Sequence, residues 1–223
     1  MFTDKFKFID LSHVIDENIS IFPSIPLPKI TSFLSHSKSK LTGRYKNCTC
    51  ELTKIEFVTS VGTYIDSPFH FVPDGKDISE LDLKDLVVNG LCLDYSKIKD
   101  KYINIDSANK FKLQNKALLI YTGWGKYWGK SEYMNHPYLS KDSAKLLVDK
   151  KVKLVGIDTL NIDNPDDPER PVHNILLGNN IFIIENLTNL NLLIKKEFTF
   201  FAVPPKIKKS ATFPVRAFAV VKG

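Results

Sequence analysis

The chain has 223 residues, of which 43% are hydrophobic and 25% charged, and its formal net charge is +6. These values are typical of a globular protein and exclude disordered and membrane-embedded chains, because no apolar run approaches the ~20 residues that span a bilayer. The lysines are scattered and their densest groups are short, so we expect solvated surfaces rather than a nucleic-acid or membrane partner.

The first half of the chain predicts mainly extended structure. Lys7–Leu11 is a short β-like run, and the proline-punctuated residues 22–28 predict an irregular segment. Residues 48–61 alternate between apolar and polar side chains, which predicts one long strand. Residues 77–88 carry leucines that predict a helical turn at their start, and Ala117–Thr122 is a continuous apolar run typical of a buried strand.

The second half alternates between helices and strands. Ser140–Lys150 predicts the best helix of the chain, with Ser140 as its N-cap, and it leads into a buried strand at Leu154–Ile157. The short apolar segment Asn174–Leu177, stopped by Gly178, and the strand that ends at Glu185 form a second pair of this kind. Two further strands are expected at 198–203 and 215–221. Strands dominate, with helices on one side, which favours an α+β (mixed β/α) fold.

The N-terminal residues lack the charged-then-apolar layout of a secretory signal, so a cytoplasmic location is expected. Cys48, Cys50 and Cys92 are an odd number without metal-finger spacing, so we expect reduced thiols rather than a disulfide framework. No repeat or low-complexity linker divides the chain, and residues 1–223 are expected to form a single domain.

Four ionisable residues stand at or near the ends of apolar runs, where ligand pockets form at the rim of a sheet: Asp66, His70, His173 and Glu185. Carboxylates together with imidazoles are suitable ligands for Zn²⁺ or Mn²⁺. The same residues also fit a structural interpretation, in which Glu185 is a solvent-facing strand end, His173 caps a helix and Asp66 makes an Asx turn before Pro68. The spacing alone does not decide between these alternatives.

Ordered motifs along nearly the whole chain resemble those of the cyclase family, which contains bacterial kynurenine formamidase and isatin hydrolase. The likeness covers residues 10–13, 60–70, 156–163, 171–178, 184–188 and 214–217. It implies the swivelling β/β/α fold of that family, with a distorted, barrel-like sheet flanked by helices and assembly as homodimers or homotetramers. The strand count agrees with this expectation.

The central motif of that family is H-x-G-T-H-x-D-x-P-x-H, and here it has Ser60 and Tyr64 in place of the first two histidines. The resemblance implies Asp66, His173 and Glu185 as metal ligands, with His70 beside the metal. Hydroxyl groups hold their protons far more tightly than imidazole, so Ser60 and Tyr64 are poor ligands and a two-metal centre is not expected. One divalent ion, Zn²⁺ or Mn²⁺, with a bound water is the expected cofactor, although it could also be absent.

The resemblance further implies an amide hydrolase similar to kynurenine formamidase, in which a metal-activated water attacks a formamide or lactam carbonyl. His70 would pass a proton to the leaving amine, and Tyr64 would donate a hydrogen bond to the oxyanion or simply fill space and satisfy Asp66. Two alternatives stay open: a metal-free ligand-binding protein, and a metal-free enzyme with His70 as base and Tyr64 as acid. His13 and His136 are more often structural.

The expected substrate is a small aromatic amide, since family members that act on such compounds use aromatic pockets. The chain offers Phe22, Trp124, Tyr127 and Trp128 for such a pocket. The two tryptophans belong to one loop, which fits a subunit interface equally well.

Overall fold

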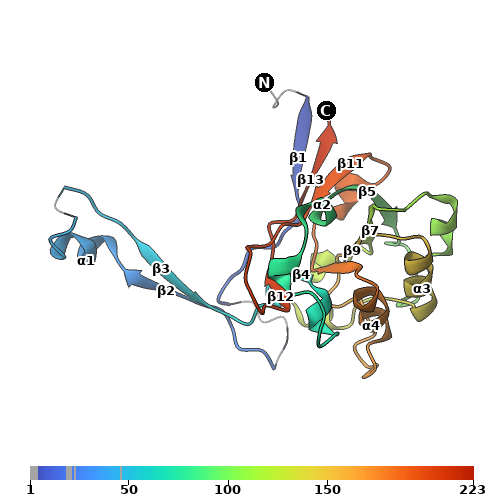
Figure 1. Ribbon diagram of the computed structural model, residues 1–223, viewed down its shortest axis with the longest axis horizontal. Helices are drawn as coiled ribbons and strands as arrows, with labels where there is room; N and C mark the ends of the chain where they lie inside the picture. Colours follow the sequence, from blue (N-terminus) through green and yellow to red (C-terminus); the bar gives the residue numbers. More distant parts are fainter. Residues whose placement is uncertain (1–4, 19–21, 23, 46) are drawn as a thin grey trace. The chain divides into compact units, whose positions relative to one another are not determined.

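The computed structural model describes residues 5–18, 22, 24–45 and 47–223. The chain divides into two compact units, which we call unit 1 (Met1–Val14 with Thr59–Gly223) and unit 2 (Ile15–Val58). Unit 1 holds the large sheet and the longer helices (Figure 1). The expectation of a single domain over residues 1–223 stays a prediction.

Unit 1 is built on a curled, nine-stranded mixed sheet (Figure 1). Its strands follow the spatial order β1 (Phe6–Asp10), β13 (Phe218–Lys222), β11 (Phe198–Phe201), β5 (Val87–Asp94), β7 (Ala117–Tyr121), β9 (Leu154–Ile157), β10 (Phe182–Glu185), β4 (Tyr64–Asp66) and β12 (Thr212–Pro214). Strands β5, β7, β9 and β10 are parallel, and the outer strands pair antiparallel on both sides. The predicted mixed α+β fold with a distorted, barrel-like sheet is confirmed.

Both faces of the parallel strands are buried, which explains why their sequences are continuous apolar runs. In β7, Ala117 and Leu119 belong to one hydrophobic cluster, whereas Leu118 and Ile120 belong to the other. The second cluster also contains the inward side chains of the two longest helices, so these helices cover that face of the sheet.

The two longest helices are α3 (Lys141–Asp149) and α4 (Pro171–Gly178), which pack against each other. Ser140 caps α3 as the sequence predicts, because its hydroxyl accepts a hydrogen bond of 3.0 Å from the backbone N–H of Ser143. Pro171 begins α4, at the position where a missing backbone N–H costs nothing.

The shorter elements of unit 1 connect the strands. They comprise α2 (Leu83–Leu86), a small parallel pair β6 (Tyr102–Ile103) and β8 (Tyr138–Leu139), and the 3₁₀ turns η2 (Pro68–His70), η3 (Ile78–Glu80), η4 (Asp106–Lys110), η5 (Trp124–Tyr127), η6 (Ser131–Met134) and η7 (Leu190–Leu193). No helix among the described residues has the length and apolar character needed to cross a membrane. The three cysteines are free thiols, as expected.

Unit 2 consists of an antiparallel hairpin, β2 (Lys29–Leu34) and β3 (Leu52–Glu56), with the short helix α1 (His36–Leu41) between its strands. The register shifts between Ser32 and Leu34, as in a β-bulge. The hairpin lies in the stretch between β1 and β4 in the sequence.

Two predicted strands are shorter in the structure. The strand expected over residues 48–61 is confined to Leu52–Glu56, the residues that pair with β2 from Leu34 to Lys29. The strand expected over 215–221 begins only at Phe218, since the backbone N–H of Val215 bonds instead to the carbonyl of Thr63 at 2.9 Å.

Candidate active site

The candidate site lies where β4 and β10 run side by side beneath the start of α4. Tyr64 pairs with Glu185 and Asp66 pairs with Ile183 across these antiparallel strands, so alternate side chains of both strands point to the same face. That face is the one that α4 covers, and α4 supplies His173. Three segments far apart in the sequence therefore meet at one place.

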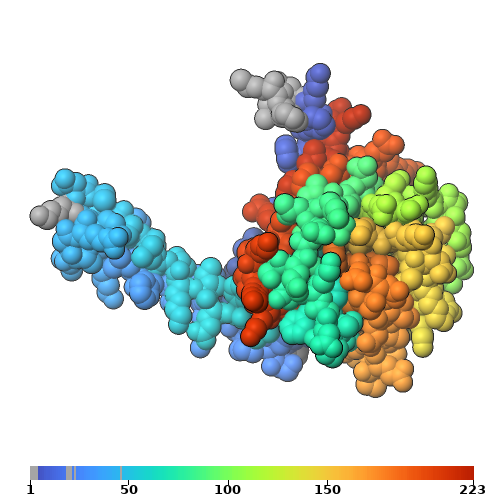
Figure 2. Space-filling model, viewed as in Figure 1, coloured from blue at the N-terminus to red at the C-terminus, as the bar shows by residue number. Residues whose placement is uncertain are grey.

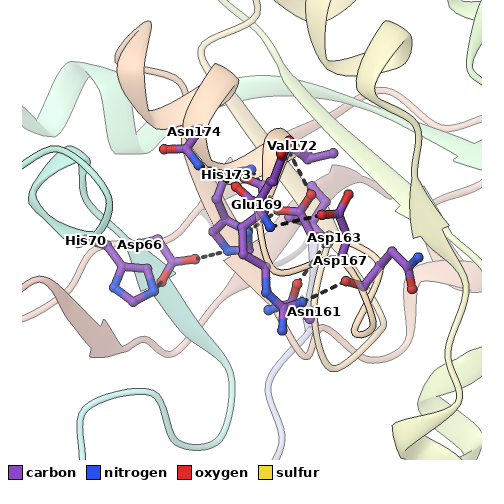
Figure 3. A network of polar contacts seen from close by, with 12 residues as sticks. Asp66, His70, Asn161, Asp163, Asp167, Glu169, Val172, His173 and Asn174 are labelled. Carbon is purple, nitrogen blue, oxygen red and sulfur yellow. Dashed lines mark hydrogen bonds and ion pairs between the residues drawn. The ribbon is translucent and has the colours of Figure 1, made fainter.

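Asp66 is fully buried, and neither of its carboxylate oxygens has a hydrogen-bond partner among the described residues. Two imidazoles face it instead (Figure 3): His70 Nε2 lies 4.0 Å from Oδ1, and His173 Nε2 lies 3.6 Å from Oδ2. A buried carboxylate without hydrogen bonds is costly unless a cation compensates it. Ligand atoms of these three residues lie within 4.8 Å of one another, which suits a single metal ion.

The imidazole of His173 is held in one orientation by a contact at its Nδ1 atom. Its Nδ1 lies 2.6 Å from Asp163 Oδ2, which leaves Nε2 directed at Asp66 and at Glu185 Oε1, 3.5 Å away. The ring of Phe71 stacks on the imidazole with centroids 4.6 Å apart. Burial opposes the charged form of His173, but the hydrogen bond to Asp163 and the negative charges of Asp66 and Glu185 outweigh it and raise its pKa to about 10.

Asp163 contacts the candidate site, although the sequence pattern gave it no role. Besides His173 Nδ1, it accepts the backbone N–H groups of Val172 (2.8 Å) and His173 (2.9 Å). These are first-turn donors of α4, and the side chain of its N-cap residue, Arg170, makes no capping bond to them. Asp163 thus caps the helix and fixes the imidazole at once. The sequence feature that could have predicted this capping role is the position of Asp163 shortly before a helix that begins with proline.

Glu185 is fully buried at the end of β10. Its Oε2 accepts a hydrogen bond from the Tyr64 hydroxyl, and its Oε1 accepts the backbone N–H of Ile162 at 2.7 Å. Burial raises the pKa of Glu185. Burial and the Glu185 charge raise the pKa of Tyr64 well above its usual value. The expectation that the Tyr64 hydroxyl satisfies Asp66 is wrong, because Glu185 is the closer acceptor across the strand pair.

Ser60, at the other altered motif position, is also bonded within the protein. Its hydroxyl lies 3.1 Å from the hydroxyl of Thr212, which lies in turn 2.7 Å from that of Thr59. Both hydroxyls at the altered positions, those of Ser60 and Tyr64, therefore engage protein groups rather than the space beside Asp66.

His70 is the most accessible member of the site, with 33% of its side chain exposed. It sits on η2, which contacts α4, and Figure 2 shows the teal residues of this region beside the orange residues of α4 at the surface. Burial lowers the pKa of His70, against a smaller upward effect of Asp66. Its imidazole is therefore neutral at pH 7 and can accept a proton.

The structural interpretation of Asp66, His173 and Glu185 is wrong in each of its parts. Glu185 is buried rather than solvent-facing, and His173 lies inside the first turn of α4 rather than at its cap. Asp66 makes no Asx turn, since its oxygens bond to no backbone N–H among the described residues.

Asn186 joins the site to the aromatic residues of the following loops. It has a positive φ of 57°, its Oδ1 accepts the Tyr133 hydroxyl at 2.9 Å, and its Nδ2 donates to the Gly62 carbonyl at 2.9 Å. Tyr133 lies edge-on to Trp128, with ring centroids 5.4 Å apart. The loop with the two tryptophans is thus tied to the residue directly after Glu185.

His13 and His136 stand apart from the cluster around Asp66. The ring of His13 stacks on Trp128 with centroids 4.0 Å apart, and burial lowers its pKa to about 4. His136 is fully buried with Nδ1 2.9 Å from the Pro137 carbonyl, and burial lowers its pKa to about 4 as well. Trp124 and Tyr127 pack together at 4.8 Å. Phe22 belongs to unit 2, and its part in a pocket stays a prediction.

Solved structures share this fold. An isatin hydrolase bound to the product analogue thioisatinate superposes with a TM-score of 0.86 at 21% identity, covering 98% of this chain and 94% of that one. A structure described as a "potential metal-dependent hydrolase with cyclase activity" gives 0.80 at 23% identity, covering 98% and 99%. The protein therefore has the curled mixed α+β architecture of these structures.

The sequence comparisons identify the family. A family model named Cyclase ("Putative cyclase") matches residues 9–164, and the chain belongs to this family. The kynurenine formamidase of Bacillus anthracis is 29% identical over 214 residues, which cover 95% of this chain and 96% of the relative. An uncharacterized protein of Methanocaldococcus jannaschii is 34% identical over 165 residues, covering 71% and 77%.

Proposed function

We propose that this protein is a metal-dependent hydrolase that cleaves a non-peptide amide bond in a small molecule. The main support for this proposal is the environment of the Asp66 carboxylate, which is fully buried, has no hydrogen bond among the described residues and faces two imidazoles. The names of the full-length relatives, kynurenine formamidases, support an arylformamidase-like reaction on an aromatic formamide or lactam.

The donor set fits one divalent ion. Asp66 and His173 would be its central ligands, and Glu185 Oε1 and His70 Nε2 lie on either side of them. Carboxylate oxygens and imidazole nitrogens suit Zn²⁺ and Mn²⁺ alike. When bound, such an ion activates a water molecule and polarises a carbonyl group.

The remaining roles belong to the side chains of the protein. His70 is neutral at pH 7 and partly exposed, so it can take a proton from the attacking water and deliver it to the leaving amine. The Tyr64 hydroxyl is already donated to Glu185, and its raised pKa makes it a weak acid. We therefore propose that Tyr64 orients Glu185 and does not donate a proton to the substrate. This disfavours a metal-free mechanism with Tyr64 as the acid.

The test is hydrolysis of an N-formyl aromatic amine, measured before and after chelation and after addition of Zn²⁺ or Mn²⁺, with metal content determined by mass spectrometry. We expect about one ion per chain and activity that chelation abolishes and metal restores. Asp66→Asn should lose both metal and activity. The exposed neighbour Asp74 provides a matched control, because Asp74→Asn should retain both.

His70→Ala separates two roles for this residue. If His70 moves protons, metal content stays near the wild-type value while turnover falls by about 10²–10⁴-fold. Protein that binds no metal would refute the proposal and favour a ligand-binding role. Turnover that survives chelation but disappears in His70→Ala would instead favour metal-free acid–base catalysis.

A further inference from the structure

A cavity in unit 1 lies apart from the candidate active site. It has a volume of about 640 Å³, within the range of roughly 300–1,000 Å³ that small-molecule sites occupy. Its lining comes from β5, β13 and the region where β11 begins, together with Phe6 of β1 and Lys116 directly before β7. Strands β7 and β9 separate β5 from β10 in the sheet (Figure 1), and the cavity does not include the cluster around Asp66.

The apolar side of this cavity forms where β5 changes its partners. Residues Val87–Gly90 of β5 pair with β11, whereas Gly90–Asp94 pair with β7, so Gly90 belongs to both pairings. The ring of Phe198 lies so close to Gly90 that any side chain there would collide with it. Val221 pairs with Phe198 on the neighbouring strand, and both side chains are buried. Glycine at this position therefore makes room for an aromatic ring beside the cavity.

The polar side of the cavity is positively charged. Lys116 stands directly before β7, Lys196 stands shortly before β11, and Lys222 ends β13. Among the described residues, none of these three ammonium groups forms an ion pair. Glu197 is the one carboxylate among the described residues of the lining, which leaves a net formal charge of +2. A ligand that carries two negative charges would neutralise this side of the cavity.

An amide group adds a directional donor to the cavity. The Oδ1 atom of Asn89 accepts a hydrogen bond of 3.3 Å from the hydroxyl of Thr199, which lies opposite it on β11. The NH₂ group of Asn89 has no hydrogen bond among the described residues, and the side chain is exposed. It can therefore donate to an oxygen of a bound molecule.

The type of cation indicates the type of anion. Planar carboxylates are matched best by the two-pronged guanidinium of arginine, and no arginine is found among the described residues that line the cavity. Lysines act as point charges, and three of them on three different segments suit a tetrahedral group with three free oxygens. A phosphate monoester offers these oxygens and carries about −1.5 to −2 charges at pH 7.

We propose that this cavity is a second ligand site, which binds a small phosphate monoester with a flat, largely apolar body. The phosphate contacts Lys116, Lys196 and Lys222, and the body packs beside Phe198 and Val221. The proposal concerns this cavity alone, and it holds whether or not the site at Asp66 is catalytic.

Calorimetric titration with 1-naphthyl phosphate provides the test, with 1-naphthol and inorganic phosphate as its two halves. We expect the ester to bind at least about tenfold more tightly than either half, and to bind more weakly as salt is added. The double variant Lys196→Gln/Lys222→Gln should weaken binding about tenfold. Lys206→Gln/Lys208→Gln is the matched control with unchanged binding, because both lysines are exposed in unit 1 and lie outside the cavity.

Acetylation of the wild-type protein gives a second readout that does not depend on the folding of a variant. Saturating 1-naphthyl phosphate should slow the acetylation of Lys116, Lys196 and Lys222, read by mass spectrometry, and leave Lys206 and Lys208 unchanged. An ester that binds no more tightly than its halves, or that protects none of the three lysines, would overturn the proposal. Binding that survives in the cavity variant but disappears in Asp66→Asn would place the ester at the candidate active site and would overturn it as well.

Discussion

Replacing Asp163 by asparagine tests how the protein holds its metal-binding imidazole. Asp163 accepts three N–H groups: two from the backbone of α4 and one from Nδ1 of His173. An asparagine has one acceptor oxygen, so its NH₂ group must face at least one of these donors. If it faces Nδ1, that nitrogen has no acceptor, and the neutral imidazole that a metal requires would carry its proton on Nε2, the atom that points at Asp66.

Metal affinity should therefore fall about 10–100-fold, the usual effect of losing such a supporting carboxylate, or ~1.4–2.8 kcal/mol. Competition with a chromogenic chelator measures this directly on the apo-protein. Asp166→Asn in the same loop is the matched control, because Asp166 is exposed. An affinity of folded Asp163→Asn within twofold of the wild-type value would refute the idea that Asp163 orients His173.

Three further outcomes are expected. Burial lowers the pKa of His136 from 6.5 to about 4, so its contribution to the free energy of unfolding is fully present above pH 6.5 and is lost as the pH drops towards 4. The free energy of unfolding should fall by ~2 kcal/mol at pH 5 because of this residue. Denaturant titration of His136→Gln should show a smaller fall between the two pH values. The double variant Ser60→His/Tyr64→His should raise the metal content from one ion to two per chain. An unchanged metal content would mean that the pocket beside Thr212 and Glu185 does not accept a second ion. Asn186→Gly should be more stable than Asn186→Ala by ~1 kcal/mol in thermal unfolding, because only glycine accepts the positive φ freely.

The sequence predicted the elements whose patterns are local. Ser140 marks the start of α3, and the apolar runs at Ala117 and Leu154 are buried strands, because capping and continuous burial leave signals in adjacent residues. The sequence did not predict β2, since its pairing with β3 depends on residues on the far side of α1. The late start of β13 at Phe218, in place of the expected residue 215, was missed for the same reason, because the backbone N–H of Val215 bonds to Thr63, which lies far away in the chain.

The candidate site was partly predictable for a related reason. Asp66, His173 and Glu185 each stand next to an apolar run, and the structure brings all three together. The contacts that support them were not predicted, because these contacts depend on how strands and loops pair in three dimensions. Tyr64 reaches Glu185 only through the pairing of β4 with β10, and Asp163 reaches His173 only because the loop before α4 folds back on the helix.

The separation of Asp66, His173 and Glu185 along the chain has a consequence for the lifetime of the protein. An ion shared by β4, α4 and β10 would act as a cross-link that closes long loops of the chain. Because the unfolded chain cannot present these ligands together, free metal at 100 times its dissociation constant would stabilise the fold by ~2.7 kcal/mol. Resistance to proteolysis should then rise and fall with metal supply, so that a cell short of the ion would lose the protein itself as well as its activity.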